Sequence, residues 1–364
     1  MTALFDTAGL GRLTLPNRLV MSPMGRGRTT ADGTPLPVMA EYYAQRASAG
    51  LIISEATHPG PVAVGHAHSV RLHTAEQAKA WSAVVDSVHA RGGRIFLQIM
   101  HAGRVSHPDL HGAVPLAPSA VAAPGIARVF EGAPPYPVPR PMTGEDLTRT
   151  AEEFARCAET AVGIGFDGVE LHGANGYLLH QFLAANTNLR SDAYGGGPQA
   201  RVRFPVEVAA AVARRIGADR VGIRLSPGFP LNGMDEPDRA EVYPALLVEL
   251  AELGLAHVHF VAGSDPELVR RLSRSWPATV IVNLGTGLQD TAGTRAAADQ
   301  ALADGADLLS FGRQFLANPD LPERLRGGTP LNAPRPEFFY EGGPAGYTDY
   351  PALGASVPAG SPAA

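Results

Sequence analysis

One short segment carries three side chains that could act together on a carbonyl compound. His172, Asn175 and Tyr177 follow directly after the apolar run 168–171. Imidazole and carboxamide N–H groups can both donate to one carbonyl oxygen and stabilise an enolate as it forms, and a tyrosine hydroxyl on the same loop can protonate the adjacent carbon. An alternative with equal support from the spacing is that His172 and Asn175 cap the loop and the next helix while Tyr177 packs.

Two glycine turns near the end of the chain could hold a phosphate. Gly285 follows the apolar run 280–283, and Gly312 directly precedes Arg313. Glycine lets backbone N–H groups approach a phosphate closely, and arginine adds charge-assisted hydrogen bonds. Because glycine at such turns is also ordinary, the turns alone favour phosphate binding only slightly.

Two other polar residues end apolar runs. A cation at the position of Arg224 is costly unless it meets an anion, so Arg224 could hold a carboxylate or an electron-rich ring; the alternative is an ion pair with Glu55 or Glu170. Gln98 offers a donor and an acceptor to a heterocyclic amide edge, or else a hydrogen bond inside the protein.

Several reactive residue types are predicted to be structural. His257 and His259 share one face of a predicted strand, but no further ligand motif accompanies them, and no metal site is predicted. Cys157 is the only cysteine and falls in a helical pattern, so it is expected to pack in the core. Lys79, the only lysine, lies inside a predicted helix, which disfavours Schiff-base chemistry.

Length and composition favour one large domain in the cytoplasm. The chain has 364 residues, of which 45% are hydrophobic, and a net charge of -5. This mild acidity gives no reason to expect nucleic acid or an anionic membrane as a partner. No apolar run approaches the roughly 20 residues that span a bilayer. No secretory signal is visible, and a lone cysteine fits a reducing cytoplasm.

Short apolar runs alternate with helix-periodic segments, a pattern typical of an α/β protein with a parallel sheet. Eight strands point to a single closed (β/α)8 TIM barrel. The expected strands are 18–21, 51–54, 95–98, 168–171, 221–224, 257–260, 280–283 and 307–310, and the expected helices are 74–90, 143–163, 201–216, 238–253, 265–274 and 289–304.

Three segments are expected outside the barrel repeat. Residues 4–15 predict an N-terminal hairpin that caps the bottom of the barrel. Residues 107–140, rich in Pro, Ala and Gly, predict a long loop after strand three that covers the mouth, because loops of this length are uncommon unless functional. The barrel domain is expected over 1–353, with a disordered tail over 354–364.

Long motifs in the same order resemble the Old Yellow Enzyme family of FMN-dependent ene reductases, especially the bacterial N-ethylmaleimide, pentaerythritol tetranitrate and morphinone reductases. The similarity runs from 15–18 to 346–351. The most specific stretches are EYYAQRASAGLIISEA at 41–56, GYLLHQFL at 176–183, RSDAYGG at 190–196 and FGR at 311–313.

The resemblance implies FMN at the barrel mouth and NAD(P)H as the reductant. The implied substrate is a small activated alkene, such as an α,β-unsaturated carbonyl compound, a maleimide or a nitroalkene, and the implied assembly is a monomer or homodimer. His172 and Asn175 would bind the substrate oxygen, and Tyr177 would protonate the α-carbon after hydride transfer from flavin N5. The implied flavin contacts are Pro23, Met24, Gly25, Ala56, Gln98 and Arg224 at the ring and Gly285, Gly312 and Arg313 at the phosphate; His66, Met100 and Tyr340 would line the substrate side.

Three departures from the family pattern affect the substrate pocket. Gly25 stands where many relatives have Thr or Cys, whose side chain hydrogen-bonds near flavin O4. Met100 replaces a bulky aromatic residue, and His66 replaces a tyrosine. A specialised reaction within the family is therefore one alternative. From the residues alone, a non-redox phosphate-binding isomerase and a non-catalytic binding barrel are two others.

Overall fold

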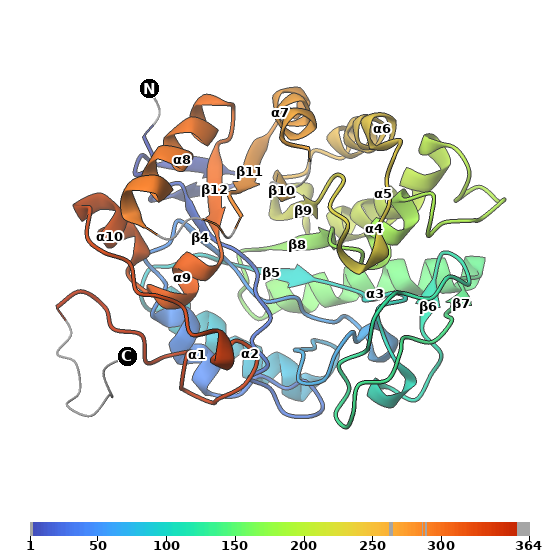
Figure 1. Cartoon of the computed structure of the whole chain (residues 1–364), viewed down its shortest axis with the longest axis horizontal. Helices are drawn as coiled ribbons and strands as arrows, with labels where there is room; N and C mark the ends of the chain where they lie inside the picture. The colour runs from blue at the N-terminus through green and yellow to red at the C-terminus, as the bar shows by residue number, and fades with distance from the viewer. Residues whose placement is uncertain (1–2, 262–264, 286, 288–289, 355–364) are drawn as a thin grey trace.

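The computed structural model describes residues 3–261, 265–285, 287 and 290–354 (Figure 1). Its parallel strands close into one barrel in the order β10-β11-β12-β3-β4-β5-β8-β9, which confirms the predicted (β/α)8 fold. The barrel strands are β3 (Leu19–Met21), β4 (Leu51–Ile53), β5 (Ile95–Ile99), β8 (Gly168–Gly173), β9 (Val221–Leu225), β10 (His257–Val261), β11 (Thr279–Asn283) and β12 (Leu308–Phe311).

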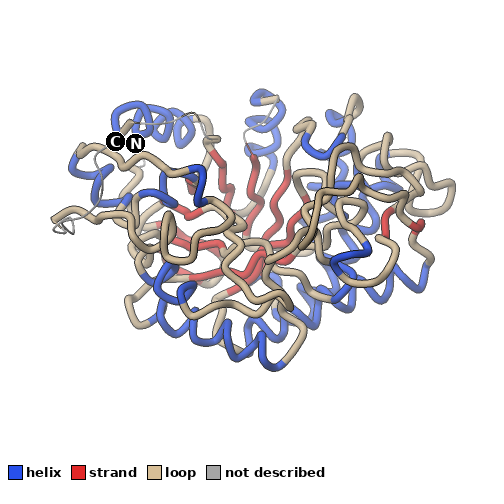
Figure 2. Tube along the Cα trace, turned by 60° about the horizontal axis from the view of Figure 1, so that its bottom comes forward, coloured by secondary structure: helices blue, strands red, loops and turns tan. Residues whose placement is uncertain are grey.

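Helices surround the strands, as the tube view shows (Figure 2). Capping boxes begin two of the predicted helices, with Thr74 paired to Gln77 and Thr143 paired to Asp146. Among the described residues, no helix is long and apolar enough to cross a membrane. The helices are α1 (Val38–Ala44), α2 (Ala75–His89), α3 (Gly144–Gly163), α4 (Leu178–Leu183), α5 (Pro198–Ile216), α6 (Arg239–Glu252), α7 (Pro266–Ser275), α8 (Thr291–Ala303), α9 (Arg313–Ala317) and α10 (Leu321–Gly327).

A buried polar cluster lies inside the barrel. The Glu170 carboxylate accepts hydrogen bonds from Gln98 Nε2 at 2.8 Å and interacts with His257 Nε2 at 3.1 Å and His259 Nδ1 at 2.8 Å. All four residues are buried. The two histidines therefore serve the barrel interior, as the sequence predicts, and Gln98 makes the internal hydrogen bond that was its alternative role.

The predicted N-terminal hairpin caps the bottom of the barrel. Strands β1 (Ala8–Leu10) and β2 (Leu13–Leu15) pair antiparallel. Leu10 and Leu15 are fully buried in a cluster with Leu51, Phe96 and Leu308 of the barrel. Because the hairpin closes this end, the carboxyl ends of the strands form the open end of the barrel.

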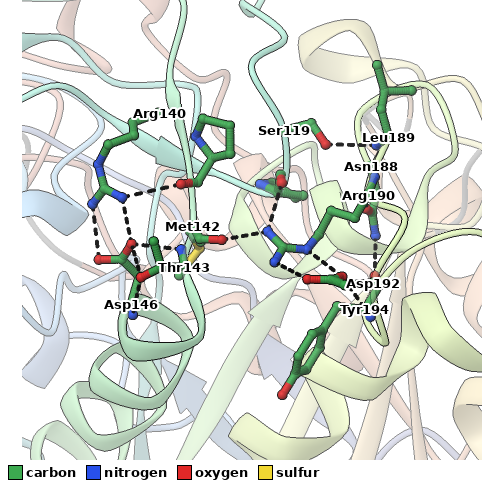
Figure 3. A network of polar contacts seen from close by, with 12 residues as sticks. Ser119, Arg140, Met142, Thr143, Asp146, Asn188, Leu189, Arg190, Asp192 and Tyr194 are labelled. Atoms are coloured by element: carbon green, nitrogen blue, oxygen red, sulfur yellow. Dashed lines mark hydrogen bonds and ion pairs between the residues drawn. The ribbon is translucent and has the colours of Figure 1, made fainter.

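Hydrogen bonds hold the long loop after β5 at both of its ends (Figure 3). Short strands β6 (Leu116–Ala117) and β7 (Arg140–Pro141) pair in parallel. Arg190 donates to the carbonyl oxygens of Pro118 at 3.1 Å and Met142 at 2.7 Å, and Ser119 Oγ accepts from the Leu189 N–H. The RSDAYGG motif thus anchors this loop and leaves its middle part to cover the barrel mouth.

The C-terminal segment returns across α1. Tyr347 stacks on Tyr42 with ring centroids 3.9 Å apart, and the Arg46 guanidinium lies 3.9 Å from the Tyr42 ring. The Arg26 guanidinium donates to the Gly346 carbonyl at 2.7 Å. This stack holds the segment that precedes Tyr347 beside the barrel mouth. Of the expected tail, 355–364 lies outside the described residues.

Candidate active site

A cavity of about 500 Å³ opens at the carboxyl ends of the barrel strands. Its volume is in the range of small-molecule and cofactor sites. The long loop, the segment after β9 and the C-terminal segment complete its walls. The lining residues are Ser22, Pro23, Met24, Gly25, Arg26, Gly65, His66, Val105, Arg128, Tyr136, Tyr177, Arg224, Leu231, Asn232, Asn283, Gly285, Gly312, Arg313, Leu316, Phe339 and Tyr340.

The structure brings most of the predicted flavin residues into this one cavity. Ala56 and Gln98 do not line it, and the Gln98 amide is already bonded to Glu170. A flavin contact from Gln98 would have to share that amide. The predicted residues that do line the cavity are Pro23, Met24, Gly25, Arg224, Gly285, Gly312 and Arg313.

The candidate phosphate end has open backbone and an exposed cation. Gly285 has a φ of 79°, in the left-handed region that favours glycine, and a Cβ there would meet nothing within 4 Å. Gly312 precedes α9 without a side-chain cap. The Arg313 side chain is exposed beside the same cavity. These features fit a phosphate group.

Arg224 is a buried cation without an ion-pair partner among the described residues. It is 7% exposed, and its Nε and Nη1 atoms have no hydrogen-bond partner there. Glu170 is occupied by the barrel cluster, and Glu55 accepts from the Arg26 backbone N–H, so neither proposed ion pair forms. Burial lowers the pKa of Arg224. Since a buried unpaired cation is costly, this geometry fits an electron-rich ligand such as the FMN ring.

The loop after β8 has an unusual backbone that its surroundings hold in place. Asn175 and Gly176 have φ angles of 58° and 77°, and a left-handed non-glycine residue persists only where neighbouring groups fix it. Helix α4 begins after Tyr177 with no side-chain capping bond among the described residues, so the helix-capping role is not found, whereas His172 does cap the loop by accepting the Ala174 N–H. The holding bonds are Asn175 N–H to Ser226 Oγ (2.9 Å), Asn232 Nδ2 to Asn175 O (2.8 Å), Gly176 N–H to His180 Nδ1 (2.9 Å) and Gln181 Nε2 to Gly176 O (2.7 Å).

His172 is held as a neutral donor. Its Nδ1 accepts the Ala174 N–H at 3.3 Å, so the proton of the neutral ring is on Nε2. Burial, with a further contribution from the Arg224 charge, lowers the pKa of His172 to about 3. At neutral pH this side chain can therefore donate one N–H without carrying charge.

Tyr177 reaches the cavity beside His172. The two rings meet edge to face with centroids 5.0 Å apart. Burial, reinforced by Tyr136 and Tyr340, raises the pKa of Tyr177 to about 12. Its hydroxyl is therefore protonated at neutral pH, as a proton donor requires.

The predicted substrate residues are divided by the structure. His66 and Tyr340 line the cavity, whereas His172, Asn175 and Met100 do not. Met100 is only 1% exposed. A Cβ added at Gly25 would lie 3.9 Å from His66 Cε1. Two of the departures from the family pattern are therefore neighbours in one wall of the cavity.

Sequence reasoning missed several cavity residues. Arg128 and Tyr136 come from the middle of the long loop, and Leu231 and Asn232 come from the segment after β9. The length of the long loop marked it as functional, but no local pattern showed which of its residues turn inward. The segment after β9 gave no such sign.

Comparisons with known proteins agree with the geometry. The model of the NADH:flavin oxidoreductase / NADH oxidase family matches residues 3–332. The chain belongs to this family. It is therefore an FMN-dependent oxidoreductase that uses NAD(P)H, as predicted. Family membership also rules out the two alternative hypotheses of a non-redox isomerase and a non-catalytic binding barrel.

Relatives lie among the family's alkene reductases. Morphinone reductase in complex with tetrahydroNAD is 43% identical, with a TM-score of 0.91 over 97% of this chain and 98% of that one. The Old Yellow Enzyme homologue from Zymomonas mobilis is 36% identical, with a TM-score of 0.92 over 97% and 100%. A probable flavin mononucleotide-dependent alkene reductase of Leishmania infantum is 38% identical over 94% and 95% of the two chains. The predicted resemblance to Old Yellow Enzyme is confirmed, and general FMN-dependent alkene reduction is supported.

Proposed function

We propose that the protein reduces the C=C bond of activated alkenes, namely α,β-unsaturated carbonyl compounds, maleimides and nitroalkenes. The observation that carries this proposal is that the rings of His172 and Tyr177 meet edge to face, while His172 pairs across β8 and β9 with Arg224, whose Nε and Nη1 atoms have no partner among the described residues. His172 suits a substrate oxygen that gains negative charge, and Tyr177 suits a substrate carbon that must be protonated.

The cavity residues divide into cofactor and substrate roles. Gly285, Gly312 and Arg313 would hold the FMN phosphate, and Arg224 would face the electron-rich part of the ring. Pro23, Met24 and Gly25 would line the ring, with Ala56 and Gln98 as the family resemblance implies. Bound FMN supplies a hydride, taken from NAD(P)H, to the β-carbon of the alkene.

The remaining residues complete the reduction. His172 Nε2–H and the Asn175 amide would donate to the substrate oxygen and stabilise the charge that develops there. The Tyr177 hydroxyl would give its proton to the α-carbon and recover one from water. The alkene thus gains one hydride and one proton. His66, Tyr340 and Met100 are proposed to shape the substrate side.

Two broader assignments accompany this function. The lone cysteine, Cys157, is buried, and we retain a cytoplasmic location on the basis of cysteine usage. A monomer or a homodimer is proposed for the assembly. A family member with a specialised substrate is the second candidate, because Gly25 and His66 together alter one wall of the cavity.

A visible spectrum of the purified protein tests the cofactor, and a two-step reaction tests the chemistry. We expect flavin bands that bleach with NADPH or NADH under anaerobic conditions and return when N-ethylmaleimide is added. N-ethylsuccinimide should be the product. Reduced flavin that no enone, maleimide or nitroalkene reoxidises would contradict alkene reduction while leaving the cofactor assignment intact.

A further inference from the structure

The cavity is positively charged. Its described lining includes four arginines, Arg26, Arg128, Arg224 and Arg313, and no aspartate or glutamate. Such a lining focuses positive potential on whatever enters. Each of these arginines can donate hydrogen bonds to an acceptor in the protein or in a ligand.

Three of the four arginines have assigned acceptors. The Arg26 guanidinium donates to the carbonyl oxygens of Phe339 at 2.9 Å and Gly346 at 2.7 Å, and so belongs to the fold. Under the proposed function, Arg224 meets the FMN ring and Arg313 meets its phosphate. Arg128 is the remaining cation.

Arg128 has no ion pair, and its guanidinium makes no hydrogen bond, with the residues that the structure describes. The side chain is exposed, and its guanidinium carbon lies 4.6 Å from the centroid of the Tyr340 ring. A guanidinium that stacks on an aromatic face keeps its N–H edges free to donate in the plane. Tyr340 therefore orients Arg128 without using its donors.

Arg128 lies on the substrate side of the cavity. Burial raises the pKa of Tyr136 and Tyr177, and the Arg128 charge opposes both rises. The same charge adds to the lowering of the His66 pKa by burial. These residues, with Arg128 itself, all line the one cavity. The free cation is thus close to the proposed proton donor.

We propose that Arg128 is a recognition site for an oxyanion, a carboxylate or phosphate group, on a molecule that binds beside Tyr177. The inference rests on the proposed function and adds a preference for anionic ligands to it. The oxyanion has two possible sources: a carboxylate on the alkene, or a phosphate of the nicotinamide nucleotide. In either case a planar guanidinium suits two-point binding of the group.

Calorimetry with unreactive analogues tests the first source. FMN-loaded protein is titrated with N-ethylsuccinimide and with 3-succinimidopropionate, which differ by a carboxylate. We expect 3-succinimidopropionate to bind the native protein at least tenfold more tightly than N-ethylsuccinimide does. In Arg128→Gln the ratio of the two Kd values should fall to near one. Binding of the neutral analogue should change less than about twofold. Rising salt should reduce the native ratio.

Flavin reduction tests the second source. Apparent Kd values for NADPH and NADH are measured by stopped-flow absorbance in the native protein and Arg128→Gln. A native preference for NADPH that disappears in the variant, without a carboxylate preference in calorimetry, assigns the oxyanion to the nucleotide. Loss of the carboxylate preference alone assigns it to the alkene. Both results support the inference.

Two further variants separate charge from packing. Arg203 is an exposed arginine of α5 that lies 5.7 Å from the Tyr194 ring outside the cavity, so Arg203→Gln removes a comparable stacked charge and should change neither ratio. Arg128→Lys keeps the charge and should retain part of the preference. The inference is overturned if neither anionic preference exists in the native protein, or if Arg128→Gln weakens neutral and anionic ligands equally. A flavin that fails to bind or to be reduced would instead contradict the proposed function.

Discussion

At the scale of single residues, the two proposed donors, His172 and Tyr177, are neutral for the same electrostatic reason, although their pKa values shift in opposite directions. Burial disfavours the charged form of each group, which lowers the pKa of His172 to about 3 and raises that of Tyr177 to about 12. Both groups therefore keep one state across the physiological range.

Tyr177→Phe is expected to separate the two half-reactions. Removing the hydroxyl removes the proton donor, and general acid catalysis commonly contributes about 100-fold or more. Reoxidation of the reduced flavin by 2-cyclohexenone should slow by about that factor, while reduction by NADPH should change less than about twofold. Stopped-flow absorbance measures both steps. An equal loss in both would show that Tyr177 only supports the cavity.

Gly25→Thr is expected to raise the FMN midpoint potential. The added side chain fits, because its Cβ would lie 3.9 Å from His66 Cε1. A hydroxyl that donates to the ring favours the electron-rich reduced form. One hydrogen bond of about 1 kcal/mol corresponds to roughly 20 mV for a two-electron couple.

The matched control for this potential is Gly25→Ala. It adds the Cβ without the hydroxyl and should leave the potential close to that of the native protein. Spectroelectrochemistry measures all three proteins. An unchanged potential in Gly25→Thr would place residue 25 away from the flavin.

At the scale of elements, a buried cluster joins the loops after β8 and β9. Glu236 Oε1 lies 3.0 Å from His180 Nε2 on α4 and accepts from the Tyr243 hydroxyl on α6 at 3.0 Å. Glu236 Oε2 accepts the Gly228 N–H at 2.9 Å. His180 also accepts the Gly176 N–H, so the cluster ends on the strained backbone that precedes Tyr177.

His180→Phe is expected to misplace Tyr177. It removes both hydrogen bonds of the imidazole and leaves the Gly176 N–H without its acceptor, which costs about 1–3 kcal/mol. Because a displacement of about 1 Å can cost about 100-fold in rate, alkene reduction should slow by about 10–100-fold, with flavin reduction nearly unchanged.

Tyr243→Phe is the control for the cluster. It keeps the contact between His180 and Glu236, so its effect on alkene reduction should be below about threefold. Thermal unfolding and both half-reactions are measured on each variant. If His180→Phe lowers stability but spares the alkene step, the cluster supports the fold without positioning Tyr177.

Elements with local signals were predictable from the sequence, and those that depend on distant contacts were not. The threonines that begin α2 and α3 form their capping boxes within the helix itself. Helix α4 is short and buried on every side, so it has no amphipathic period to detect. Arg128 and Tyr136 face the cavity only because the anchored long loop folds over it. The amide of Gln98 is used by Glu170, a partner on a neighbouring strand that sequence spacing did not reveal.

At the scale of the whole molecule, the proposed contact of Arg224 with FMN would couple cofactor binding to stability. An unpaired buried cation destabilises the protein without FMN, and a ligand that binds only the folded state stabilises it by about 2.7 kcal/mol at 100 times its Kd. Arg224→Met should therefore raise the Tm of the FMN-free protein and reduce the increase that FMN produces. Calorimetric scans at several FMN concentrations measure both effects. A lower Tm without FMN would show that Arg224 has a stabilising partner in the apoprotein.

The seam between β12 and β3 has a consequence for biosynthesis. Leu309 of β12 pairs with Leu19 of β3, and the Tyr42–Tyr347 stack joins α1 to the C-terminal segment. During translation, Leu19 and Tyr42 leave the ribosome long before their partners, Leu309 and Tyr347. The barrel can close only after β12 (Leu308–Phe311) has been synthesised, and Arg313 follows that strand within two residues. Ribosome-bound chains should therefore bind FMN only after residue 313 has left the exit tunnel.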